Sequence, residues 1–353
     1  MRGSKRLFYI VLLALSALIA GQSWAWWSWA KSPVLAADEV SEDSFVQVQI
    51  PAGTASNQIG QDLEANGLIR STTAWKLLSR WKSFRGEEGG FQAGSYIISP
   101  GQSLGEIANT IWEGDVIQTS FTVPEGWNRQ QMAEMFEADG FTTAEDFLAV
   151  TESIPYDRYP WLPEGIPHLE GFLYPDTYQM DAGSVTAEGI VDAMLSRFES
   201  VALPVYDAQP SPYTLLDWVT LSSIVEKEAV VAEERDEIAG VFSRRLDEGI
   251  TLGSDPTVEY GLGIRQTKEV PLTYAQVETP TDYNTYMNAG LTPTPIASPG
   301  VASLEASLNP EPSEYLYFVA RYDGTHVFSR TLAEHQSAQG QIRDRIDAET
   351  SNN

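Results

Sequence analysis

The sequence predicts an α+β protein with an N-terminal transmembrane helix, a small αβ subdomain, and a larger, mostly helical α+β domain that ends in a short strand pair. Three observations support this class. An uncharged apolar run of 24 residues lies near the N-terminus. Short alternating segments, typical of strands, flank two helical stretches, and helical periodicity dominates residues 184–249. We expect an anchor at 1–30, a linker at 31–44, the subdomain at 45–118, the large domain at 119–346 and a tail at 347–353.

The composition excludes several classes of protein. The chain has no cysteine, which excludes disulfides, thiolate zinc sites and a cysteine nucleophile. None of the three histidines lies at a metal-ligand spacing: His168, His326 and His335. The net charge of −27 argues against nucleic-acid binding and against adhesion of the folded body to anionic lipid. We expect no metal and no cofactor.

The apolar run at residues 7–30 is long enough to cross a bilayer as a helix. The charges before it are all basic: Arg2, Lys5 and Arg6. Its far end carries four tryptophans, which favour the membrane interface: Trp24, Trp26, Trp27 and Trp29. The basic side stays in the cytoplasm, so we expect a single-pass inner-membrane protein with an extracytoplasmic, periplasmic body. A cleaved signal peptide is the alternative, although bulky tryptophans crowd the candidate cleavage site at 23–25.

The subdomain is predicted to begin after a polar tether at 31–44. Residues 45–50 alternate as a half-buried strand, two helical stretches follow, and residues 94–99 form a second strand. Ser103 caps a further helix, and residues 116–123 form a third strand. The order strand, helix, helix, strand resembles a LysM-type fold, a small module common in proteins that handle cell-wall glycans. A generic α+β domain without a ligand is the alternative.

The larger domain begins with two helices, capped by Asn128 and Thr143. A loop rich in Pro, Tyr and Trp covers residues 155–167, and residues 184–249 are largely helical. The chain is then rich in loops to about residue 299. It ends with a helix, a strand pair at 315–320 and 326–329, and an acidic terminal helix.

The helix at residues 215–229 (LLDWVTLSSIVEKEA) places one glutamate toward the interior. With about 100° per residue, Leu221, Ile224 and Val225 fall within about 60° of Glu228. Glu226 falls about 160° away, on the solvent side. A carboxyl in apolar surroundings has a raised pKa and can act as a general acid. The alternative is a buried ion pair of Glu228 with Arg235 or Arg244.

A second helix follows at residues 233–246 and stops at Gly249. Its first turns carry four acids: Glu233, Glu234, Asp236 and Glu237. We expect these acids to complement the helix dipole on a solvated surface.

Eight motifs in one order resemble the endolytic murein transglycosylase family (MltG/YceG-like). They are VPEGW (123–127), LEGFLYPDTY (169–178), SSIVEKEA (222–229), ERDEIAGVFSRRL (234–246), GSDPTVEYGLG (253–263), ETPTDYNTY (278–286), GLTPTPIASPG (290–300) and the pair YLYFVA and GTHVFSRTLAEH (315–335). The resemblance covers nearly the whole exported part. Thr292 and Thr294 depart from the expected pattern and put the shape of that loop in doubt.

The resemblance implies a lyase that cuts the MurNAc–GlcNAc bond within peptidoglycan strands without water, leaving 1,6-anhydroMurNAc ends and limiting strand elongation. The family's catalytic acid falls on Glu228, the second glutamate of E-K-E. The nucleophile belongs to the substrate, so no second carboxylate is needed. Cell-wall synthases are expected partners, besides the glycan strands and the membrane.

The same motifs supply candidate substrate contacts: Glu170, Asp176, Asp255, Tyr283, Asn284 and Tyr286. Each has a plainer reading. Asp176 and Asp255 adjoin prolines and fit turns, and Tyr286 fits a core position. We expect Asn284 and Tyr283 to be the first contacts.

Two rival functions remain open. An ordinary glycoside hydrolase would need a second carboxylate about 5–10 Å from Glu228, and Asp255 and Glu170 are the candidates. A membrane-tethered glycan-binding scaffold would need no catalysis. A metal hydrolase is nearly excluded by the lack of ligands.

Overall fold

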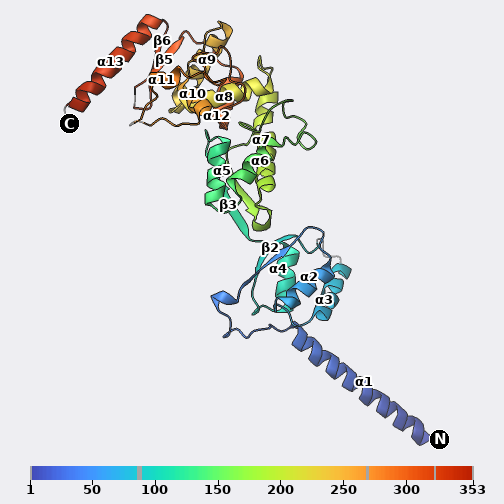
Figure 1. Cartoon of the computed structure of the whole chain (residues 1–353). Coiled ribbons are helices and arrows are strands. Elements are labelled where there is room, and N and C mark those ends of the chain that lie inside the picture. The colour runs from blue at the N-terminus through green and yellow to red at the C-terminus, as the bar shows by residue number, and fades with distance from the viewer. Residues whose placement is uncertain (1, 86–89, 268–269, 322, 352–353) are drawn as a thin grey trace. The chain divides into compact units, whose positions relative to one another are not determined.

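The computed structural model describes residues 2–85, 90–267, 270–321 and 323–351 of the chain, which forms two compact units (Figure 1). The first unit runs to Ser120 and includes Gln179–Val185. The second comprises Phe121–Tyr178 and the residues from Thr186 on. Each unit has its own hydrophobic core.

The first unit begins with α1 (Arg2–Lys31), whose stretch Ile10–Lys31 is long and apolar enough to cross a membrane. A signal sequence would pass the same test of length and composition. Ala30 is fully buried and Trp27 packs against the core of the first unit. Arg70 donates from its guanidinium to the carbonyls of Pro33 (2.9 Å) and Val34 (3.1 Å). The predicted linker is therefore bound to the unit at its start. It ends in a short 3-10 turn, η1 (Glu42–Ser44).

The predicted order strand, helix, helix, strand is confirmed in the first unit. The elements are β1 (Val46–Ile50), α2 (Ser56–Ala65), α3 (Thr72–Phe84), β2 (Gly94–Ile98) and α4 (Leu104–Glu113). β1 and β2 pair antiparallel with Val48 opposite Tyr96. Trp75 of α3 is fully buried in the same hydrophobic core as Val48 and Tyr96. Ser103 caps α4 as predicted, in a reciprocal capping box with Glu106.

The chain leaves the first unit through β3 (Gln118–Thr122) and returns to it through β4 (Thr177–Asp181), and these two strands pair. The returning segment continues as the turn η2 (Ala182–Ser184). The first crossing lies between Ser120 and Phe121. The sequence did not predict the return, because β4 is a short strand whose partner lies more than fifty residues earlier.

The second unit is mostly helical, as predicted. Its elements are α5 (Arg129–Ala138), α6 (Ala144–Glu152), α7 (Ala187–Asp207), α8 (Leu215–Glu228), η3 (Ala232–Glu234), α9 (Arg235–Asp247), α10 (Asp255–Leu262), α11 (Tyr274–Val277), α12 (Val301–Leu308), β5 (Tyr317–Ala320), β6 (His326–Ser329) and α13 (Leu332–Ser351). Asn128 and Thr143 cap α5 and α6 as expected. The terminal helix extends to Ser351, into the predicted tail.

The core of the second unit is built on α8. Trp218 is fully buried and donates its indole N–H to the carbonyl of Leu304 in α12 (2.8 Å). Leu221, Ile224 and Val225 are also fully buried, which confirms the predicted apolar stripe. α12 and α9 pack against α8.

The expectation that Glu226 faces solvent is wrong. Its Oε2 accepts from the backbone N–H of Gly300 (3.2 Å) and from the hydroxyl of Ser303 (2.6 Å), at the start of α12. The helix period was right, but α12 covers the face that it assigned to water. Two of the acids at the start of α9, which we expected on a solvated surface, also make contacts within the protein. Glu234 bonds to His326 (2.7 Å), and Glu237 accepts from Ser313.

We expect Glu226→Ala to lower the free energy of unfolding by about 1–3 kcal/mol, because a carboxylate that accepts two hydrogen bonds at a helix start is lost. Chemical unfolding of the full-length protein in detergent measures this. Glu199→Ala, an exposed glutamate on α7, is the matched control. Equal stability of the two variants would contradict the role of Glu226.

Candidate active site

Glu228 is the last residue of α8, where the buried stripe of the helix meets the surface. The next residue, Ala229, is extended, so the helix ends directly after the glutamate. The side chain of Glu228 is partly buried. Ser254, which is 1% exposed and precedes α10, donates its hydroxyl to Oε1 of Glu228 (2.7 Å). This contact fixes the carboxyl in position.

The surroundings raise the pKa of Glu228 from 4.5 to about 7. Burial is the main cause, since it penalises the charged form. The negative charges of Asp255 and Glu259 act in the same direction, whereas the hydrogen bond from Ser254 and the positive charge of Arg245 oppose it. Near neutral pH the carboxyl can therefore both give and receive a proton.

The described contacts do not support the alternative that Glu228 is half of a structural ion pair. Among these residues no salt bridge joins it to Arg235 or Arg244, and Arg244 pairs with Glu248 (2.8 Å) instead. The cation that acts on Glu228 is Arg245. The guanidinium of Arg245 donates to three backbone carbonyls: Leu316 (2.6 Å), Leu252 (2.6 Å) and Thr251 (3.3 Å).

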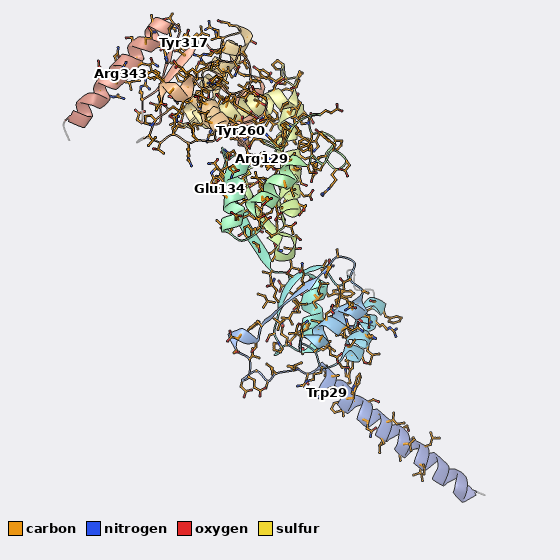
Figure 2. The ribbon with its side chains drawn as sticks, in the orientation of Figure 1. Trp29, Arg129, Glu134, Tyr260, Tyr317 and Arg343 are labelled. Carbon is orange, nitrogen blue, oxygen red and sulfur yellow. The ribbon has the colours of Figure 1, made fainter. Side chains whose placement is uncertain are left out.

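Glu170 is a second buried carboxyl, only 2% exposed. It accepts from the backbone N–H of Arg129, 3.0 Å to Oε1 and 3.2 Å to Oε2, and from the hydroxyl of Tyr260 (3.0 Å). Figure 2 shows Arg129 and Tyr260 next to each other. Burial raises the pKa of Glu170 to about 7 although the nearby Arg129 charge and these hydrogen bonds lower it.

α10 connects the two carboxyls. Ser254, just before the helix, holds Glu228, and Tyr260, in its last turn, holds Glu170. Asp255, at the first position, accepts from the hydroxyl of Tyr286 (2.6 Å). The structure thus brings Glu170, Asp255 and Tyr286 to the same helix as the contact of Glu228.

The loop at 283–286 packs against α10. The ring of Tyr283 lies 4.9 Å from the ring of Tyr260, and its hydroxyl lies 2.8 Å from the hydroxyl of Thr294. Tyr286 is 42% exposed, which removes the reading of Tyr286 as a core residue. Its phenol remains protonated at neutral pH, because burial of the hydroxyl and the charge of Asp255 raise the pKa.

Asn284 is fully buried and organises this loop. Its amide donates to the carbonyls of Val277 (2.8 Å) and Thr279 (2.9 Å), and its oxygen accepts from the N–H of Tyr286 (3.0 Å). These contacts occupy the groups that we expected to meet a sugar directly. Asp176 makes its side-chain contacts elsewhere, with Arg197 of α7 (2.6 Å) and the N–H of Thr177.

The loop in which Thr292 and Thr294 depart from the expected pattern is tightly held. Thr292 donates to the carbonyl of Thr294 (2.7 Å), and the N–H of Ile296 donates to Ser223 of α8 (3.0 Å). Gly171, beside Glu170, has a φ of +82°, and a Cβ there would lie 2.4 Å from Pro295. Only glycine allows this approach of the two loops.

Three residues of the site were missed by the sequence analysis: Ser254, Tyr260 and Arg129. A signal for Ser254 existed, because a serine followed by Asp-Pro is typical of a helix start. Tyr260 and Arg129 join the site only through tertiary contacts. Among the residues that the structure describes, no group of three or more His, Asp or Glu side chains is arranged to hold a metal ion.

The chain matches the model of the YceG-like family over residues 48–341. It belongs to this family. An endolytic murein transglycosylase of Bacillus subtilis is 31% identical over 318 residues, which is 86% of each chain. One from Streptococcus pneumoniae is 29% identical over 94% of this chain and 66% of its own length. The crystal structure of a yceG-like protein from Listeria monocytogenes superposes with a TM-score of 0.55 at 32% identity, covering 83% of this chain and 99% of that one. The predicted family is confirmed.

We expect Glu228→Gln to stabilise the protein more at pH 8 than at pH 5. A carboxyl whose pKa rises from 4.5 to about 7 on folding costs stability as the pH rises through that range, by up to about 3 kcal/mol. The amide removes this cost. Thermal unfolding at both pH values measures the difference, with the exposed Glu233→Gln as control. The same stabilisation at both pH values would mean that burial does not raise the pKa.

Proposed function

We propose that this protein is an endolytic murein transglycosylase that uses Glu228 as its catalytic acid. The observation that carries the proposal is the carboxyl of Glu228, which has a pKa of about 7 and accepts from Ser254. It lies in the family motif E-K-E, in a chain whose relatives carry this enzyme name.

In the proposed mechanism the protonated Glu228 donates to the glycosidic oxygen of GlcNAc as the bond to C1 of MurNAc breaks. The carboxylate then takes the proton of the MurNAc C6 hydroxyl while O6 attacks C1. One C–O bond breaks and one forms, no water is consumed, and Glu228 is protonated again. The hydrogen bond from Ser254 occupies Oε1, so we assign the proton transfer to Oε2.

Hydrolysis is the second candidate, because the site holds another carboxyl with a pKa of about 7, Glu170. A base that activates water needs a free face toward the substrate. Glu170 is 2% exposed and is held by Tyr260 and Arg129. Asp255 is held by Tyr286. These contacts favour positioning roles and a nucleophile supplied by the substrate.

We propose Tyr286 and Tyr283 as sugar contacts, since a partly exposed tyrosine ring offers a face for stacking and a hydroxyl for hydrogen bonding. Asp255 would orient Tyr286. Asn284 would act through the loop that it holds, and Asp176 through its ion pair with Arg197.

The proposed location is the inner membrane, with α1 retained as the anchor and both units on the periplasmic side. The apolar stretch Ile10–Lys31 supports this. We propose that residues 45–118 of the first unit form a LysM-like module, because two helices lie between the paired strands β1 and β2. Cell-wall synthases are the proposed partners.

The test is incubation of the full-length protein in detergent with uncrosslinked glycan strands, followed by mass spectrometry of the new ends. We expect internal fragments with 1,6-anhydroMurNAc ends. Glu228→Gln should slow their formation about 10²–10⁴-fold, the usual contribution of a general acid, and Glu233→Gln should not.

Two other outcomes would overturn the proposal. Reducing ends would identify water as the nucleophile and require a second carboxylate. If the unaltered protein and Glu228→Gln bound strands equally well and neither cut them, the scaffold function would be favoured.

We expect the cutting rate to fall as the pH rises through about 7, because the first step needs protonated Glu228. The hydrogen bond from Ser254 lowers this pKa, so Ser254→Ala should move the fall to higher pH. Rates measured from pH 5 to 9 test this. Ser303→Ala, which removes the hydroxyl bound to Glu226, is the control. If the cutting rate of Ser254→Ala fell at the same pH as that of the unaltered protein, Glu228 would be excluded as the titrating group.

A further inference from the structure

α3 of the first unit has an apolar stripe that its own unit does not cover. Leu77, Trp81 and Phe84 recur at the spacing of one helix face and are 48%, 50% and 90% exposed. The opposite face carries Trp75, which is fully buried in the core. A helix that is apolar on both sides needs a second apolar environment.

The residues around this stripe carry positive charge, whereas the protein as a whole is strongly negative. Residues 65–86 contain five basic residues and no acid, whereas the whole chain has 22 basic and 49 acidic residues. Lys76 and Arg80 project from the exposed face, and the described residues give neither of them a carboxylate partner within salt-bridge distance. Arg85 lies over the ring of Trp81 at 4.4 Å. The surface is therefore basic and aromatic.

This surface lies where α1 joins the first unit. α3 contacts α1, and Figure 1 shows it beside the end of α1 that enters the unit. Arg70, just before α3, lies over the ring of Trp29 (5.7 Å) and bonds to the carbonyl of Pro33. The apolar stretch Ile10–Lys31 ends at the same place. A pocket of about 470 Å³ at this place is lined by Trp27 and Lys31 of α1, Leu78 of α3 and the start of α4.

We propose that α3 lies on the outer surface of the bilayer that α1 enters. Leu77, Trp81 and Phe84 insert among the lipid headgroups, and Lys76, Arg80 and Arg85 pair with the phosphates of anionic phospholipids. Basic, aromatic, amphipathic helices bind such surfaces. The contact of α3 with α1, whose apolar stretch is long enough to cross a membrane, decides for lipid over a second copy of this chain. The inference rests on α1 as a retained anchor and does not depend on the lytic activity.

The absence of cysteine allows the position of α3 to be measured in the full-length protein. Single cysteines replace Thr73, exposed on α3, Glu113, at the far end of α4, and Leu15, in α1. Each carries a fluorophore in nanodiscs of phosphatidylglycerol and phosphatidylcholine, one protein per disc, with spin-labelled lipids as quenchers. Trp112, next to Glu113, lies 5.1 Å from the ammonium of Lys82 on the buried face of α3, opposite the exposed stripe, so Glu113 reports a site behind α3 and away from the bilayer.

We expect quenching by labelled headgroups to be at least threefold stronger at Thr73 than at Glu113, and acyl-chain labels to quench at Leu15. Arg80→Glu and Phe84→Ser should each reduce the quenching at Thr73 at least twofold. Both side chains are exposed, so the fold is unaffected. Arg343→Glu, on the exposed face of α13, is the matched control and should leave the quenching at Thr73 unchanged.

Equal quenching at Thr73 and Glu113 would overturn the proposal. So would a signal at Thr73 that appears only with two proteins per disc, which would identify a second copy as the occupant. Failure of the acyl-chain labels to quench at Leu15 would overturn it as well, because α1 would then lie outside the bilayer.

Discussion

The site depends on one constraint: a carboxyl must be kept from water at the end of a buried helix and still be able to exchange a proton. α8 keeps the carboxyl away from water, because Trp218 and Leu221 fix this helix in the core of its unit. The burial disfavours the carboxylate. The hydroxyl of Ser254 partly offsets that penalty, so the pKa of Glu228 remains near neutrality instead of rising further.

α10 is the element through which the parts of the site act on one another. This eight-residue helix and the serine directly before it make the contacts to Glu228, Glu170 and Tyr286. The N–H of Ser254, at its start, donates to Thr285 (3.0 Å). The loop buried by Asn284 therefore supports the same serine that holds Glu228. Polar residues of the predicted sugar-binding motif can thus affect catalysis without meeting a sugar.

The sequence predicted those parts of the fold and the site that are set locally. The caps at Ser103, Asn128 and Thr143 and the inward direction of Glu228 follow from spacing within one helix. The surroundings of Glu226 do not follow from such spacing, because α12, which contacts this residue, lies more than seventy residues further along the chain. The contacts that hold Glu170, and the pairing of β4 with β3, also join residues far apart in the sequence, so spacing within one helix could not predict them. A helix period identifies one buried face and leaves open what covers the other.

The same limit applies to charge. A net charge of −27 is a property of the whole chain, whereas a bilayer acts on charges within about one Debye length, ~10 Å. Lys76 and Arg80 lie on α3, Arg85 follows directly after it, and the stretch that holds them contains no acid and contacts α1. In the proposed arrangement the anionic surface that attracts α3 repels any acidic side chains of the protein that come within this distance. Net charge and local charge would then act together, since repulsion of one part and attraction of another fix which side of the first unit faces the membrane.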